Sequence, residues 1–377
     1  MQSNFQNPNG QTQNIQNPPA EKAMQISKCA SCGANMGFSP ALQMLFCTHC
    51  TSKSQISNLA PAFNLPLSAL NDKSEWSDET HTYICSNCGA AEVLNKSEIA
   101  THCAFCGTPN IVEKEGLSGL KPNAVSPFKI ELENAGAIAK KWYNKRLFAP
   151  TAFKKCTNPK EIKGVYYPVF VFNADTLSHF RGVLVRIITT TRRINGRTVT
   201  TTREQRIPIS GTHPRSFADL LVQACNGLDK KTLKKISPFS LSRLNAYSPD
   251  YLFGFVANQH KKDGFAAWGE ATKTMENAIR NGILSGYTYN RIESLDIQTQ
   301  MQNQSFKYAL LPVYVGHCTY KNKLYNFYLN GENGKLDAKA PKSAVKILLT
   351  IFFPIGLLVL LTKGIIGLFK KIFRKRR

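Results

Sequence analysis

Eight of the eleven cysteines in this 377-residue chain form a repeated pattern between residues 29 and 106. They fall into four pairs, and two residues separate the members of each pair. Fourteen residues separate the two pairs of a set, and each cysteine of the second set follows its counterpart by 56 positions. The first set is Cys29, Cys32, Cys47 and Cys50, and the second is Cys85, Cys88, Cys103 and Cys106. This spacing indicates an internal duplication of one small module.

Paired cysteines at this spacing are typical of structural zinc sites. Two residues between thiolates allow one tight turn to present both sulfurs to one ion, and a second pair completes a tetrahedral shell with Zn–S distances of about 2.3 Å. Segments this short bury too little apolar surface to fold alone, so the metal would stabilise them, by about 10–16 kcal/mol. We therefore predict two structural Zn²⁺ sites, one in a ribbon at 26–53 and one in a ribbon at 80–110.

A disulfide framework and a catalytic dithiol are the alternatives to zinc. Disulfides need an oxidising compartment, and residues 1–20 are polar throughout, without the apolar core of a signal peptide. A catalytic dithiol needs one cysteine pair, not four in register. His49 and His102 are neighbours of predicted ligands and could replace a cysteine in one site. We expect them instead to flank the sites.

The charge of the chain points to anionic partners. The formal net charge is +24, from 48 Lys and Arg against 24 Asp and Glu. Such a protein is attracted to polyanions, either nucleic acid or an anionic membrane surface, and charge alone does not choose between them. The 42% of apolar residues is enough for a sizeable core beyond the ribbons.

Helical and strand patterns alternate after the second ribbon. Apolar residues at helical spacing predict helices at 131–146, 217–228 and 268–283. A buried strand is predicted at 166–172, and Asn195-Gly196 between two alternating segments predicts a tight hairpin. We therefore predict an α+β domain with an antiparallel sheet.

A short internal echo suggests that this domain has two related halves. Leu311-Pro312-Val313-Tyr314-Val315 repeats the pattern of Tyr167-Pro168-Val169-Phe170-Val171, which lies 144 residues earlier. Each segment follows a predicted amphipathic helix. The two halves are predicted to share one sheet.

The end of the chain has the composition of a membrane segment. Residues 347–362 contain no charge, and 370–377 contain six cations. A spanning helix needs about 17–25 residues, a length reached only by continuing through Lys363 to Phe369. We expect this segment to attach the protein to anionic membrane lipid, with the main domains in the cytoplasm, as a tail-anchored helix or a re-entrant segment. A buried core helix is the alternative.

The predicted organisation is linear. It runs as a disordered Asn/Gln-rich tail at 1–25, zinc ribbon 1 at 26–53, a linker at 54–79, zinc ribbon 2 at 80–110, an α+β domain at 120–340, a membrane segment at 345–369 and a basic tail at 370–377.

Both cysteine modules resemble zinc ribbons of the transcription factor IIB type. The segment 307–315 followed by 325–335 looks like a group of bacterial proteins labelled zinc-ribbon proteins or "primosomal protein N′ (PriA) helicase-like". The resemblance covers most of 26–345. It implies a protein partner, since some members are similar to partners of membrane-stress scaffolds of the SPFH and phage-shock kinds. It implies no helicase here, because the chain lacks the phosphate-binding Gly-x-x-x-x-Gly-Lys-Ser/Thr run.

Two functions follow from these patterns. The first is a membrane-attached, zinc-binding, non-enzymatic adaptor that presents protein-interaction surfaces. The alternative is a nucleic-acid-binding protein that uses the ribbons and the hairpin arginines Arg186, Arg192, Arg193, Arg197, Arg203 and Arg206. A charge-protected, solvated hairpin explains these arginines more simply, so nucleic acid is not favoured. No catalytic residue is predicted, because the seven histidines match no known catalytic motif.

Overall fold

The computed structural model of the chain describes residues 28–56, 60–71, 80–86, 91–95, 103, 111–114, 120–154, 162–194, 196–225, 228–258, 262–321, 323–348 and 350. A small sheet of β1 (Gly37–Ser39), β2 (Met44–Phe46) and β3 (Lys53–Ser54) lies near the beginning of this part of the chain. All other described strands belong to one large sheet.

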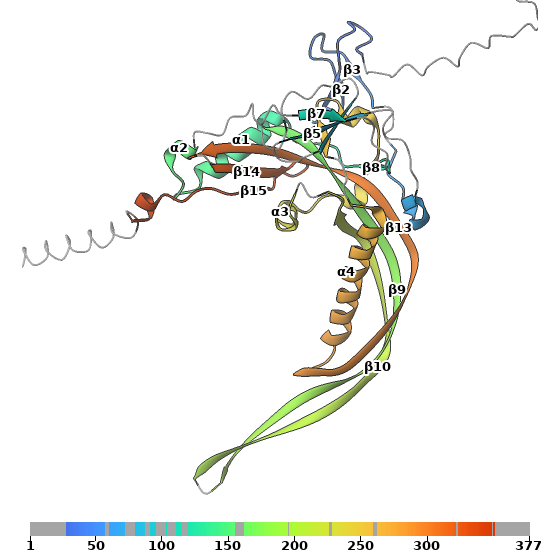
Figure 1. Ribbon diagram of the computed structural model, residues 1–377, viewed down its shortest axis with the longest axis vertical. Helices are drawn as coiled ribbons and strands as arrows, with labels where there is room; N and C mark the ends of the chain where they lie inside the picture. Colours follow the sequence, from blue (N-terminus) through green and yellow to red (C-terminus); the bar gives the residue numbers. More distant parts are fainter. Residues whose placement is uncertain are drawn as a thin grey trace, which may run out of the picture.

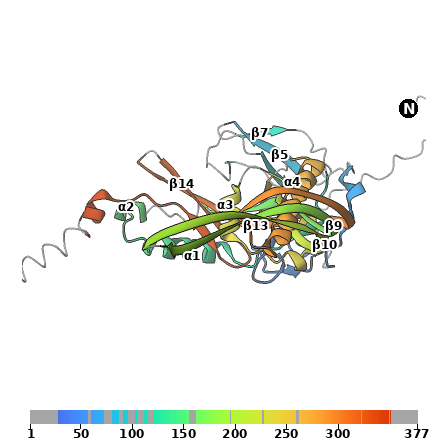
Figure 2. The ribbon, with the colours of Figure 1, turned by 90° about the horizontal axis from the view of Figure 1, so that it is seen from below.

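Three very long strands dominate the molecule and form a curved arm (Figure 1). They are β9 (Lys163–Ile194), β10 (Arg197–Gln223) and β13 (Arg291–Tyr320). β9 is central and pairs antiparallel with both of the others. At about 3.3 Å per residue, β9 extends over about 100 Å. The strands twist around one another along the arm (Figure 2), as the right-handed twist of paired strands requires.

The residue pattern of β9 changes along its length. Between Val165 and Phe172 every residue is buried, because both faces of the sheet are covered. From Ala174 to Leu184 buried residues alternate with more exposed ones, as expected for a strand with one covered face. Gly182 is required in this part, since a Cβ there would lie 2.4 Å from the backbone oxygen of Ser294 on β13.

Helix α4 (Gly264–Ser285) covers the concave side of the arm and packs against β9 and β10 (Figure 1). Asp263 caps its first turn by accepting from the backbone N–H groups of Phe265 and Ala266. Its buried residues recur at helical spacing, namely Ala267, Ala271, Met275, Ile279 and Ile283. The helix predicted at 268–283 is confirmed, as is the one at 131–146, which is α1 (Leu132–Asn144).

Shorter elements complete the body at one end of the arm. They are β4 (Leu65–Pro66), η1 (Leu67–Asn71), β5 (Thr80–Cys85), β6 (Ala91–Asn95), β7 (Ile111–Lys114), β8 (Ala124–Val125), α2 (Thr151–Lys154), α3 (Lys230–Ile236), η4 (Leu241–Arg243), β11 (Asn245–Ala246), η5 (Pro249–Leu252), β12 (Val256–Asn258), β14 (Lys323–Asn330) and β15 (Leu336–Ala338). Aromatic side chains fill the core between them, with Phe128 stacked on Phe255 at 4.3 Å between ring centroids.

The two echoing segments lie side by side at the centre of the sheet. Tyr167 on β9 pairs directly with Leu311 on β13, its counterpart in the echo. β12 runs parallel to β9 at Val165, and β8 runs parallel to β13 at Ala309, again 144 positions apart. The arrangement therefore approaches twofold symmetry around this strand pair. That the two halves are related stays a prediction.

The predicted α+β fold class is wrong, because strands predominate in the described part of the chain. The helix expected at 217–228 is instead the end of β10, which continues to Gln223. A bulge between Phe217 and Leu220 places Asp219 at φ +54°, and Asn173 of β9 accepts its backbone N–H at 2.8 Å. Pairing with the long neighbouring strand thus overrides a helical pattern of apolar residues.

The predictions of a membrane segment and of a membrane localisation are also wrong. No helix within the described ranges has both the length and the apolar character needed to cross a bilayer. Of the segment predicted at 345–369, the structure describes only 345–348 and 350, which continue a short helix from residue 344. The longest described helix, α4, has 22 residues but is amphipathic and packs on the sheet. The predicted tails at 1–25 and 370–377 lie outside the described residues.

Candidate metal centre and basic arm

The first cysteine set lies on two turns that have the same pattern of backbone hydrogen bonds. In the first turn, the backbone N–H of Gly33 donates to Cys29 O, and that of Cys29 donates to Ala34 O, both at 2.8 Å. In the second, the backbone N–H of Thr51 donates to Cys47 O, and that of Cys47 donates to Ser52 O, both at 2.9 Å. The fifth residue of each turn has a positive φ, +72° at Gly33 and 64° at Thr51.

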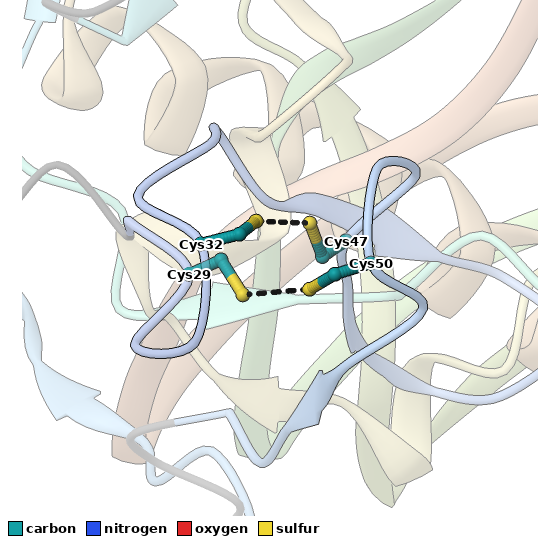
Figure 3. Close-up of side chains that lie close together, drawn as sticks. All are labelled: Cys29, Cys32, Cys47 and Cys50. Carbon is teal, nitrogen blue, oxygen red and sulfur yellow. Dashed lines mark hydrogen bonds between the residues drawn. The ribbon is translucent and has the colours of Figure 1, made fainter.

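These turns bring the four sulfurs of Cys29, Cys32, Cys47 and Cys50 together (Figure 3). All four sulfur atoms lie within 4.8 Å of one another. The closest approaches are 3.3 Å between Cys29 and Cys50, and 3.6 Å between Cys32 and Cys47. A tetrahedron with Zn–S bonds of about 2.3 Å has sulfurs about 3.8 Å apart. The cluster therefore has the size and donor set to hold one metal ion.

The cysteines of this cluster are free thiols, and the surroundings of Cys29 and Cys50 favour a thiolate. For Cys32, a backbone hydrogen bond from Ala34 lowers the pKa, but the neighbouring sulfurs and desolvation outweigh it and raise the pKa to about 12. The hydrogen bond with Cys50 and the backbone N–H of Ser31 lower the pKa of the Cys29 thiol to about 6. The pKa of Cys50 is lowered too, chiefly by the hydroxyl of Ser52, whose Oγ lies 3.1 Å from its sulfur. Deprotonated thiolates are the species that bind zinc. The sequence patterns did not identify Ser52 or Ser31, because only the closed turns place them beside the sulfurs.

The cluster is held against the core of the body. Cys29 and Cys47 are buried, whereas Cys32 is exposed and Cys50 is half-buried. Phe38 of β1 lies between two aromatic rings of the body, with centroid distances of 5.3 Å to Tyr251 and 6.2 Å to Phe255. The first ribbon is therefore part of the main hydrophobic core.

The second cysteine set is described only in part. Cys85 at the end of β5 and Cys103 are buried in one hydrophobic cluster, whereas Cys88 and Cys106 lie outside the described residues. A second metal cluster is accordingly not found within the described ranges. β5 pairs with β6 and β7, and β6 pairs with β12 of the main sheet.

The prediction of two tandem ribbons as equal modules is thus not upheld. The first forms a separate three-stranded sheet, whereas the described strands around Cys85 are continuous with the large sheet. The two cysteine modules differ because their strands pair with different segments: β6, next to Cys85, pairs with β12 of the large sheet. His49 is exposed and does not belong to the first cluster, and His102 lies outside the described residues.

The arginine-rich hairpin forms the free end of the arm. β13 begins at Arg291, opposite Val185, so β9 and β10 continue beyond it as a two-stranded tip made of 186–194 and 197–205. Ile194 pairs directly with Arg197, which confirms the predicted tight hairpin. Nearly every residue of the tip is exposed.

The two faces of the tip differ in charge. Paired residues of antiparallel strands share a face, and successive residues alternate between faces. One face, here named the arginine face, has no acidic residue and consists of Arg186, Ile188, Thr190, Arg192, Ile194, Arg197, Val199, Thr201, Arg203 and Gln205. On the opposite face, Glu204 forms an ion pair with Arg291 at 2.8 Å. Arg206 at the base of that face forms one with Glu293 at 2.9 Å.

Comparison with known proteins gives one informative match. The chain is 28% identical over 331 residues to the uncharacterized protein YdjG of Bacillus subtilis (strain 168), covering 85% of this chain and 91% of that protein. No protein-family model matches the chain, and no solved structure is significantly similar. The similarity extends over most of both chains.

Proposed function

We propose that this protein is a zinc-stabilised, non-enzymatic adaptor that recognises an acidic protein surface with the tip of its β arm. The observation that carries this proposal is the arginine face. It combines four arginines with Ile188, Ile194 and Val199 and contains no acid. Ile194 and Val199 are 53% and 45% exposed. Nothing within the described part of the chain covers them.

Several physical arguments favour a protein partner. Arginine is enriched at protein interfaces, where it pairs with carboxylates in bidentate geometry while its aliphatic part packs on apolar groups. Exposed β-branched residues between the arginines would be desolvated by an apolar partner surface, but they would gain little from a phosphate backbone. The tip is already a paired hairpin, so it loses less conformational entropy on binding than an unpaired segment would.

Variants of single faces test this proposal. Arg192→Glu with Arg197→Glu reverses charge on the arginine face, and Arg193→Glu on the opposite face is the control. Tagged full-length proteins are cross-linked in their own cells, and the captured proteins are identified by mass spectrometry. We expect an acidic protein that is recovered with the wild type and the control but lost with the double variant, and that binds the purified wild type directly. Equal recovery with all three proteins would refute the proposal.

Nucleic acid binding is the second candidate, because arginines and threonines along a two-stranded ribbon can contact phosphates and enter a major groove. Fluorescence anisotropy with a labelled DNA duplex at several salt concentrations tests it. If four arginines contact phosphates, the logarithm of the binding constant falls with a slope of about −3.6 against the logarithm of salt concentration. A slope that is unchanged when those arginines become Gln would exclude this mode.

We also infer that the cluster of Cys29, Cys32, Cys47 and Cys50 holds Zn²⁺, and that Cys85, Cys88, Cys103 and Cys106 hold a second ion. Four sulfur donors in a closed cluster favour zinc over magnesium or calcium. The matching spacing of the second set supports its equivalent role. In this role zinc is structural: it joins two turns that have little apolar surface of their own.

A further inference from the structure

The arm has two long edges, and they differ in how well they are protected against pairing with a strand of another molecule. An unpaired strand edge presents backbone N–H and C=O groups that can pair with another strand, and natural proteins block such edges with proline, charge and bulges. The outer edge of the arm on one side is β10. It contains Pro208 and Pro214 and the exposed cations Arg203, Arg206 and Arg215. This edge is therefore protected against pairing.

The opposite edge, β13, lacks this protection. Residues Ser294–Gln302 pair with β9 on one side, and no described strand pairs with them on the other. This segment, here named the open edge, is regular along its whole length, because the irregularities of β13 fall at Ile292/Ser294 and Gln302/Ser305. It contains no proline, and its single charge is Asp296.

The sequence of the open edge is complementary to itself. If two copies pair antiparallel about an axis at Gln298, the middle of the segment, Leu295 lies opposite Met301 and Ile297 lies opposite Thr299. Asp296 then lies opposite Gln300, so no like charges meet. Leu295, Ile297, Thr299 and Met301 are all half-buried, while the residues between them are exposed. The pairing therefore keeps each face of the sheet continuous from one copy to the other.

We propose that two copies of this chain associate through Ser294–Gln302, pairing as antiparallel strands about a twofold axis at Gln298 and joining their arms into one continuous sheet. Such an isologous contact closes at two copies. It leaves the arginine-face tips, which lie beyond the start of β13, unpaired and at a distance from the axis. The dimer thus presents two tips.

Charge at the axis provides the test. Gln298→Lys places two lysines opposite each other in the dimer, whereas Gln298→Glu places two carboxylates there. Thr212→Lys is the matched control, since Thr212 and Gln298 both pair with His179 and so occupy the same row at opposite edges of the sheet. Thr212 and Gln298 are both exposed, so all three variants should fold, which circular dichroism would verify.

Sedimentation equilibrium of the full-length chain measures the outcome. We expect a dimer for the wild type and for Thr212→Lys. For Gln298→Lys and for Gln298→Glu, the dissociation constant of the dimer should be larger by at least about tenfold. Mixing these two variants should restore the dimer, because opposite charges then meet at the axis. A monomeric wild type at every concentration, an unaffected Gln298→Lys dimer, or no recovery on mixing would each overturn the proposal.

Discussion

At the scale of single residues, the cysteine turns show how local sequence determines local geometry. Each turn needs two backbone hydrogen bonds and one residue at positive φ, which Gly33 supplies without strain and Thr51 supplies in a less favourable conformation. Because the same bonds form in both turns, the four sulfurs converge from positions far apart in sequence. The site is thus specified by spacing and turn chemistry together.

Removal of one buried sulfur should therefore abolish one metal site. We expect purified wild type to contain two equivalents of zinc by elemental analysis, and Cys47→Ser to contain one, with a lower melting temperature. The affinity of both proteins for zinc should fall as pH decreases, because protons compete with zinc for the thiolates. Cys225→Ala, which changes a buried cysteine outside both sets, is the control and should retain two equivalents.

A capping carboxylate gives a second prediction for a single residue. Asp229 accepts from the backbone N–H of Thr232 at 2.8 Å at the start of α3, and this bond lowers the pKa of Asp229. Because the folded-state pKa is lowered, the stabilisation is complete above the unfolded pKa of about 4 and is lost as pH falls through the folded pKa. Asp229→Ala should cost about 1 kcal/mol at pH 7.

Urea unfolding at pH 7 and at pH 3 measures this effect. The difference in unfolding free energy between wild type and Asp229→Ala should be smaller at the lower pH. Asp229→Asn, which keeps an acceptor oxygen, should lose less stability than Asp229→Ala at pH 7. A difference of equal size at both pH values would show that the carboxylate is not the stabilising group.

At the scale of elements, the arm is a long strand pair that becomes progressively less supported along its length. β9 is covered on both faces near Phe170, on one face near Ser178, and on neither face beyond Val185. Alternating Thr, Ile, Val and Arg residues maintain the strand conformation in the tip, where packing contributes little. A tip of this kind contributes little to the stability of the body.

Shortening of the tip should accordingly leave the body intact. Replacement of 188–203 by a single Asn-Gly turn keeps the ion pairs of Glu204 with Arg291 and of Arg206 with Glu293. We expect a change in unfolding free energy within about 0.5 kcal/mol, since the excised residues are almost all exposed. Thermal denaturation followed by circular dichroism tests this, and a large loss of stability would indicate that the tip packs on another part of the molecule.

At the scale of the whole molecule, the first ribbon and the large sheet share one core. Phe38 contacts Tyr251 and Phe255, and the backbone N–H of Phe38 donates to Phe253 O at 3.1 Å. The side-chain amide of Gln43 also donates to Phe128 O at 2.7 Å. These contacts predict that metal binding stabilises the body and not the ribbon alone.

Removal of the ring of Phe38 should break this coupling. Phe38→Ala removes a 95% buried aromatic side chain and should destabilise the protein by about 3–5 kcal/mol. Chelation of zinc should lower the unfolding temperature of the body in the wild type but change it much less in the variant. Leu147→Ala, at a position that is 78% exposed, is the control and should behave as the wild type. Equal effects of chelation on wild type and Phe38→Ala would contradict the coupling.

Features that depend on near neighbours were predicted from the sequence. The first cysteine cluster, the hairpin at Asn195-Gly196 and the helices at 131–146 and 268–283 follow from spacing, turn residues and periodicity, all of which act over a few residues. Features that depend on distant partners were not. The segment after Phe217 has a helical pattern, yet it forms a strand because β9 offers a ladder of backbone hydrogen bonds beside it. Three features follow from which segments become neighbours in space: the lengths of the strands, the different sheets that the two cysteine sets join, and the open edge of β13. Burial and strand pairing between residues far apart in sequence determine which segments become neighbours.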